Sequence, residues 1–206
     1  VTQVKKTPKA ISSIPVSCWT ATIHVDDEVT ASVDEKRRAA ICRNHTATHL
    51  LQKALREVLG EHVHQAGSYQ DDQITHFDFT HFSAVSPAEL AEVERRVNEK
   101  IYEALPVTVK NLPIEEAKKM GAMALFGEKY GSVVRVVDAG GWSTEFCGGT
   151  HVTNTAQIGC FKILSESSVA AGIRRIEATT AFGVLDLLDD RTEILARTAV
   201  ALRPTT

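Results

Sequence analysis

Hydrophobic residues recur with a helical period in several parts of the chain. Between residues 35 and 59 the apolar positions fall largely on one face, Asp34 is a suitable N-cap, and Gly60 suits the position just past the end. A break near Asn44 is compatible with this pattern. Residues 86–89, Ser-Pro-Ala-Glu, match a capping box with proline at the first helical position. These signals predict helices at residues 35–59, 87–104, 113–120 and 181–202.

Other segments alternate between apolar and polar positions, as strands do. In the clearest case Phe77 and Phe79 fall on one face, while His76 and Asp78 fall on the other. The pattern predicts strands at residues 62–70, 74–80, 107–111, 132–137, 158–164 and 173–179. Strands mixed with irregularly spaced helices indicate an α+β fold, with a mixed or antiparallel sheet packed against helices, rather than a regular βαβ repeat.

The composition is typical of a folded protein and excludes several classes. Of the 206 residues 43% are hydrophobic, which is enough for one core or for a core with a small appendage. No stretch approaches the run of about 20 apolar residues that a membrane span needs, so no membrane partner is expected. With a net charge of −3, charge alone would not hold nucleic acid. Four scattered cysteines predict reduced thiols in a cytoplasmic protein rather than a disulfide scaffold.

Two histidines, His45 and His49, stand four residues apart in the first predicted helix. On a helix such a pair shares one face, with Cβ atoms about 6 Å apart, which suits two ligands of one metal ion. Two ordinary helix histidines would show the same spacing. The pair by itself leaves both interpretations open.

The segment 147–151, Cys-Gly-Gly-Thr-His, adds a thiolate and a further imidazole on a flexible turn. One cysteine and three histidines make a donor set that suits Zn²⁺ and suits Mg²⁺ or Ca²⁺ poorly. His45, His49, Cys147 and His151 together predict one zinc ion between a helix and a glycine-rich turn.

Two familiar zinc chemistries do not fit these residues. The metalloprotease pattern requires glutamate directly after the first histidine of the pair, and Thr46 stands there. The nucleobase deaminase pattern requires His-x-Glu followed by Pro-Cys-x-x-Cys, and the chain has neither. The zinc site therefore has to serve another purpose.

Six blocks of sequence closely resemble the editing domain of alanyl-tRNA synthetases and the freestanding AlaX editing proteins. The blocks are RNHTATHLL, QAGS, FDF, GAMALFGEKYG, CGGTH and GIRRIEA, at residues 43–51, 65–68, 77–79, 121–131, 147–151 and 172–178. They occur in the order of the family and span most of the chain. The number and length of the blocks make the resemblance specific.

The resemblance implies a deacylase that hydrolyses Ser-tRNA(Ala) and Gly-tRNA(Ala), with zinc held by His45, His49, Cys147 and His151. The partners implied are the tRNA(Ala) acceptor end and the rest of a synthetase that ligates alanine to tRNA(Ala) with ATP. The need for such a domain is physical. A pocket made for alanine cannot exclude glycine by size, and it rejects serine by only about 10²-fold, so a second site must test the product.

The resemblance also implies that Thr48 and Gln65 are catalytic residues lining the editing pocket. The Thr48 hydroxyl would bond the serine hydroxyl or position water. The alternative for Thr48 is a hydrogen bond to the carbonyl four residues earlier in the helix. The alternative for Gln65 is a surface position on a strand.

Arg174, Arg175 and Lys129 are candidate contacts for the tRNA acceptor end. Adjacent strand residues point to opposite faces, so at most one of the two arginines faces the site directly. The alternative is an ordinary salt bridge, for example with Glu177. The family often has arginine where this chain has His76. This difference either weakens a contact to RNA or substrate or changes a pair of surface residues.

The implied reaction is hydrolysis of the ester that joins the amino acid to the terminal ribose. Zinc would either lower the pKa of a bound water or grip the substrate. Four protein ligands fill a tetrahedral site, which is typical of structural zinc. Three arrangements stay open: one ligand stands off, the ion takes a fifth ligand, or zinc only shapes the pocket. The sequence shows no obvious general base.

Two other function classes compete with an editing hydrolase: a zinc-stabilised RNA-binding module without activity, and an unrelated zinc hydrolase acting on small molecules. Aromatic residues make up only 6% of the chain, which disfavours a stacking platform for RNA. No ATP-binding or aminoacylation motif is present, so the fragment should not charge tRNA.

We expect three regions: the end of a β-rich subdomain at residues 1–33, the editing domain at 34–183, and the start of a helical linker at 184–206. This tail and the first residue, which is not methionine, favour an excised domain over a freestanding protein.

Overall fold

A computed structural model describes residues 5–6, 12–13, 24, 26, 28, 30, 32–123 and 130–202. The chain divides into two compact units, residues 1–33 and residues 34–206. In the first unit, β1 (Lys5–Lys6) and β2 (Ser12–Ser13) pair antiparallel. Most of the predicted β-rich N-terminal piece lies outside the described residues, so that prediction stays open.

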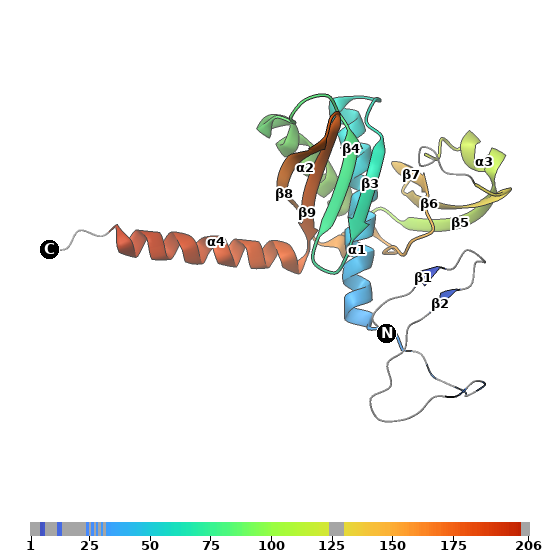
Figure 1. The fold of residues 1–206 in the computed structure, drawn as a ribbon, viewed down its shortest axis with the longest axis horizontal. Helices are drawn as coiled ribbons and strands as arrows, with labels where there is room; N and C mark the ends of the chain where they lie inside the picture. Colours follow the sequence, from blue (N-terminus) through green and yellow to red (C-terminus); the bar gives the residue numbers. More distant parts are fainter. Residues whose placement is uncertain are drawn as a thin grey trace. The chain divides into compact units, whose positions relative to one another are not determined.

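The larger unit contains a four-stranded antiparallel sheet, with α1 and α2 on one face (Figure 1). Its order is β3 (Gln65–Gln70), β4 (Thr75–Thr80), β9 (Ile173–Thr180) and β8 (Phe161–Ala170). The predicted alternation is confirmed in β4, because Phe77 and Phe79 are fully buried while His76 and Asp78 are partly exposed. The α+β architecture is therefore confirmed, and within its named sheets the described part of the chain has only antiparallel pairs.

The long helix α1 (Glu35–Leu59) supplies much of the core and carries two of the predicted metal ligands. It begins as predicted, because the Asp34 side chain accepts a hydrogen bond from the Arg37 N–H at 2.9 Å. The helix continues through Asn44, so the break considered there is wrong. The Asn44 side chain forms two hydrogen bonds outside the helix. Its amide donates to the carbonyl of Asp71, which follows β3, at 2.8 Å and accepts from the Thr180 hydroxyl at 2.7 Å.

The second helix, α2 (Pro87–Tyr102), begins with the predicted capping box, formed by Ser86 and Glu89. It packs beside α1 and against β8. Asn98 fixes it to the edge of the sheet, since its side chain accepts from the Phe161 N–H at 2.9 Å and donates to the Phe161 carbonyl at 2.9 Å.

After α2 the chain forms a smaller antiparallel sheet, with the strand order β5 (Val107–Pro113), β6 (Val133–Ala139) and β7 (Ser143–Phe146). The short helix α3 (Ile114–Lys119) packs on it through Ala117. The sequence missed β7, which has only four residues and follows a tight turn where Gly140 and Gly141 have positive φ. The strand predicted at 158–164 was placed too early, since Thr155–Ile158 form a 3-10 helix, η1, capped by Asn154.

The last helix, α4 (Phe182–Ala201), follows β9 directly and buries only Val184. Among the described helices, none combines the length and apolar character needed to cross a membrane.

Candidate metal centre

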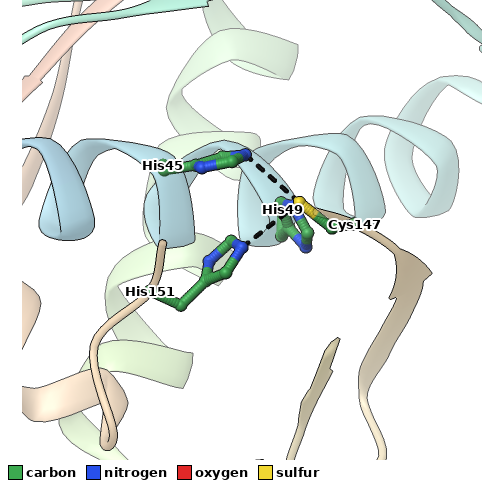
Figure 2. Close-up of side chains that lie close together, drawn as sticks. All are labelled: His45, His49, Cys147 and His151. Atoms are coloured by element: carbon green, nitrogen blue, oxygen red, sulfur yellow. Dashed lines mark hydrogen bonds between the residues drawn. The ribbon is translucent and has the colours of Figure 1, made fainter. Parts of the chain in front are cut away.

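The four predicted metal ligands meet at one point, where α1 faces the segment that follows β7 (Figure 2). His45 and His49 project from the same face of α1. Cys147 and His151 come from a stretch with neither helix nor strand. One potential ligand atom from each residue lies within 4.8 Å of the other three. Residues about a hundred positions apart are thus brought together.

Two of the distances between ligand atoms match those around a small tetrahedral ion. The Cys147 Sγ lies 3.5 Å from the Nε2 of His45 and 3.3 Å from the Nε2 of His151. Around Zn²⁺, with bonds of about 2.0–2.3 Å, neighbouring ligand atoms stand about 3.3–3.6 Å apart. The donor set of one thiolate and three imidazoles also matches zinc. On both counts these residues are suited to hold the ion.

Each imidazole also has a polar neighbour outside the cluster. The Nδ1 of His49 lies 3.5 Å from the Glu145 carboxylate, and the Nδ1 of His151 lies 3.1 Å from the Thr46 hydroxyl. His45 is hydrogen-bonded to the backbone of Thr150. Such partners hold imidazole rings in the orientation that metal binding needs.

A glycine lets the two ligand segments approach. A Cβ at Gly149 would overlap the imidazole ring of His45, whereas a Cβ at Gly148 would meet nothing within 4 Å. The Gly149 N–H also points at the Cys147 Sγ, at 3.4 Å. Gly149 is therefore part of the centre itself.

The sequence around this centre is similar to that of known proteins. Residues 134–177 match the family model described as "Threonyl and Alanyl tRNA synthetase second additional domain". The chain is 48% identical over 203 residues to an alanine--tRNA ligase of Halalkalibacterium halodurans, covering 98% of this chain and 23% of the relative. It is 56% identical over 176 residues to that of Acetivibrio thermocellus, covering 85% of this chain and 20% of the relative. The chain thus corresponds to one domain of alanyl-tRNA synthetases.

The match concerns one part of these synthetases, since the chain spans less than a quarter of the length of the relatives (23% and 20%). A third relative, the alanine--tRNA ligase of Bacillus anthracis, is 51% identical over 97% of this chain and 23% of its own length. The match to the family model includes Cys147 and His151 but begins after the two histidines of α1 in the chain.

Burial controls the protonation of the histidines at this centre. It lowers the pKa of His45 to about 4 and that of His151 to about 3, and the charge of Arg135 adds to both shifts. The pKa of His49 is also lowered, chiefly by burial. All three imidazoles are therefore neutral near pH 7, which is the form that binds a metal.

The pKa values of two acidic groups at the centre, Cys147 and Glu145, are raised instead of lowered. Burial raises the pKa of the Cys147 thiol and raises the pKa of Glu145 to about 8. Arg135 stands beside Cys147 and donates to its carbonyl at 2.6 Å. This neighbouring positive charge favours the thiolate, as a bound cation would.

Of the predicted catalytic residues, Thr48 makes the hydrogen bond to the carbonyl four residues earlier that was the alternative to a pocket role. Its buried hydroxyl donates to the Asn44 carbonyl at 2.8 Å and lies 3.4 Å from the Thr75 hydroxyl. Gln65 lies in β3, and its side-chain amide stands 3.3 Å from the Ser68 hydroxyl.

Two of the three candidate tRNA contacts are engaged in ion pairs. Arg174 pairs with both oxygens of Glu166, the Nη2 contact being 2.6 Å, and Arg175 pairs with Asp78 at 2.6 and 2.8 Å. The suggested partner Glu177 is wrong, because its carboxylate faces His76 at 3.3 Å. Lys129 lies outside the described residues.

Sequence reasoning missed three residues of the centre: Thr46, Arg135 and Glu145. Thr46 was noted only because it is not glutamate. The other two lie on β6 and β7, and their proximity to the ligands depends on sheet pairing that no local pattern reveals.

Proposed function

We propose that this domain edits tRNA(Ala), hydrolysing the ester bond of Ser-tRNA(Ala) and Gly-tRNA(Ala). The observation that carries the proposal is the convergence of three imidazoles and one thiol at distances that suit zinc, within a domain of the alanyl-tRNA synthetase family. When bound, Zn²⁺ supplies a Lewis acid that can polarise an ester carbonyl.

The residues of the candidate metal centre differ in their exposure to solvent, which suits the approach of a polar substrate. His45, Cys147 and His151 are partly exposed, and a substrate would reach the centre from their side. His49 and Glu145 are buried behind them. An aminoacyl ester would approach from the exposed side, while the buried pair holds the helix and β7 together.

Five further roles belong to the same proposal. Thr48 and Gln65 would shape the pocket for the amino acid, and Arg174, Arg175 and Lys129 would contact the acceptor end of the tRNA. Arg175 has a third of its side chain exposed, so it is better placed than Arg174 to exchange its carboxylate partner for phosphate. The parent synthetase would ligate alanine with ATP, in the cytoplasm.

The test is a deacylation assay with the purified chain, loaded with zinc, on Ser-tRNA(Ala), Gly-tRNA(Ala) and Ala-tRNA(Ala). We expect the first two to be hydrolysed and Ala-tRNA(Ala) to survive better. His45→Ala and Cys147→Ala should lose zinc and activity together, because each removes one ligand. Cys160→Ala is the matched control, since this thiol approaches the Ala181 carbonyl rather than the cluster.

Other outcomes would redirect the assignment. Binding of tRNA without hydrolysis would point to an RNA-binding module. Hydrolysis of simple aminoacyl esters without tRNA would point to a small-molecule hydrolase. Undiminished deacylation by both ligand variants would remove the metal centre from the reaction.

A further inference from the structure

Thr46 stands between the two histidines of α1, at the position where a zinc metalloprotease carries its glutamate. Its side chain is almost wholly buried, at 1% exposure. Its single hydroxyl makes three contacts: with the Cys42 carbonyl at 2.8 Å, with the Val152 N–H at 3.2 Å, and with the Nδ1 of His151 at 3.1 Å.

These three contacts can be satisfied in one way. A hydroxyl has one proton to donate and two lone pairs that accept. The Cys42 carbonyl can only accept, so it takes the proton, and the Val152 N–H can only donate, so it occupies one lone pair. The remaining lone pair faces His151, whose Nδ1 must then carry the hydrogen.

A neutral imidazole carries its proton on one nitrogen only. If Nδ1 of His151 is protonated, Nε2 has a free lone pair. That Nε2 is the atom 3.3 Å from the Cys147 Sγ, where the ligand atoms converge. The opposite tautomer would aim an N–H at the metal position and block it.

The same hydroxyl joins the two halves of the centre. The hydroxyl bonds to Cys42 in the helix that bears His45 and His49. It also bonds to Val152 and His151, in the segment that bears the other two candidate ligands. Thr48, one half-turn further on, makes a similar bond to the carbonyl four residues earlier but contacts no imidazole.

We propose that Thr46 is a positioning residue that fixes His151 in its Nδ1–H tautomer and so assigns Nε2 to the metal. This rests on the metal site of the proposed function, but not on any reaction that occurs there. A glutamate at this position would act as a general base in a metalloprotease, whereas here a hydroxyl orients a ligand.

The experiment compares Thr46→Val and Thr46→Ser with the unaltered chain. Zinc affinity is measured by competition with a chromophoric chelator at pH 7.5, and the His151 tautomer is read from long-range ¹H–¹⁵N correlation spectra of the metal-free protein. Valine keeps the shape but removes the lone pairs, so zinc binding should weaken about 10- to 100-fold. Serine restores the hydroxyl and should bind zinc close to the unaltered level.

Thr192→Val is the matched control, because it removes the same kind of helix bond, from the Thr192 hydroxyl to the Leu188 carbonyl at 2.8 Å, without touching an imidazole. It should leave zinc affinity and the His151 tautomer unchanged. Circular dichroism checks that each variant folds. Should Thr46→Val not fold, the serine variant and the spectrum of the unaltered chain still decide the question.

An Nε2–H tautomer of His151 in the unaltered chain would overturn the proposal, as would zinc affinity in Thr46→Val equal to that of the unaltered chain. Neither measurement involves tRNA. A chain with the Nδ1–H tautomer and Thr46-dependent zinc binding, but without deacylase activity, would overturn the proposed function and leave the role of Thr46 standing.

Discussion

At the scale of single residues, the chemistry of the centre depends on groups that do not bind the metal. The charge of Arg135 lowers the pKa of His45, Glu145 lies against the Nδ1 of His49, and Gly149 provides the space in which His45 lies. The sequence singled out the four residues that cluster there, because cysteine and histidine have few equivalents as zinc donors. It could not identify these neighbours, because arginine, glutamate and glycine are common everywhere.

The two adjacent glycines offer a direct test of this packing. Gly149→Ala would push a methyl group into the His45 ring, and overpacking of this kind costs about 1–3 kcal/mol. We expect zinc affinity to fall about tenfold or more, since 1.4 kcal/mol corresponds to a factor of ten. Gly148→Ala, whose added carbon would meet nothing, is the control. Equal zinc affinity of the two variants, measured by chelator competition, would contradict the packing argument.

At the scale of elements, α1 is held to the sheet by polar as well as apolar contacts. Asn44 is buried in the middle of the helix, where sequence reasoning considered a break. The residue disfavours helix when its side chain competes for the helix backbone. Here its amide bonds to the β3–β4 turn and to the end of β9 instead, and the helix continues.

Removal of that amide should therefore destabilise the whole unit. Asn44→Ala loses two side-chain hydrogen bonds and leaves the buried Thr180 hydroxyl without this partner, a cost of about 2–4 kcal/mol. Urea unfolding of the metal-free protein measures the change. Lys36→Ala, at an exposed position in the first turn of the same helix, should stay within about 0.5 kcal/mol of the unaltered chain. A change in Asn44→Ala as small as that control would show that the network adds nothing to stability.

Helices and strands with strong periodicity were predicted closely, as the capping box of α2 and the alternation of β4 illustrate. The failures were short or irregular segments. β7 has four residues, and η1 depends on a cap by Asn154, so neither is long enough to produce a period in the sequence.

At the scale of the whole molecule, α4 differs from every other long helix of the described chain. It buries Val184 near its start, while apolar residues further along remain mostly exposed, such as Leu188 at 55% and Leu195 at 70%. A helix without packing partners has little stability of its own. The fold of the rest of the larger unit should therefore not depend on α4.

A chain that ends at Asp190 tests this expectation. Its free energy of unfolding and its zinc affinity should match those of the full chain, within about 0.5 kcal/mol for stability. Val184→Ala is the contrasting variant, since it removes the buried contact and should cost about 1–2 kcal/mol. A large loss on truncation, measured by urea unfolding, would mean that the exposed turns of α4 support the fold.

The sequence by itself determined the candidate metal-binding residues, the class of fold and the family resemblance, because each depends on residue types and on order along the chain. The tertiary structure decided which atoms meet: the convergence of two distant ligand pairs, the hydroxyl of Thr46 on His151, and the ion pairs of Arg174 and Arg175. These contacts join residues that are far apart in the chain or on neighbouring strands. Their register is set by the packing of the whole core, so no local pattern encodes it.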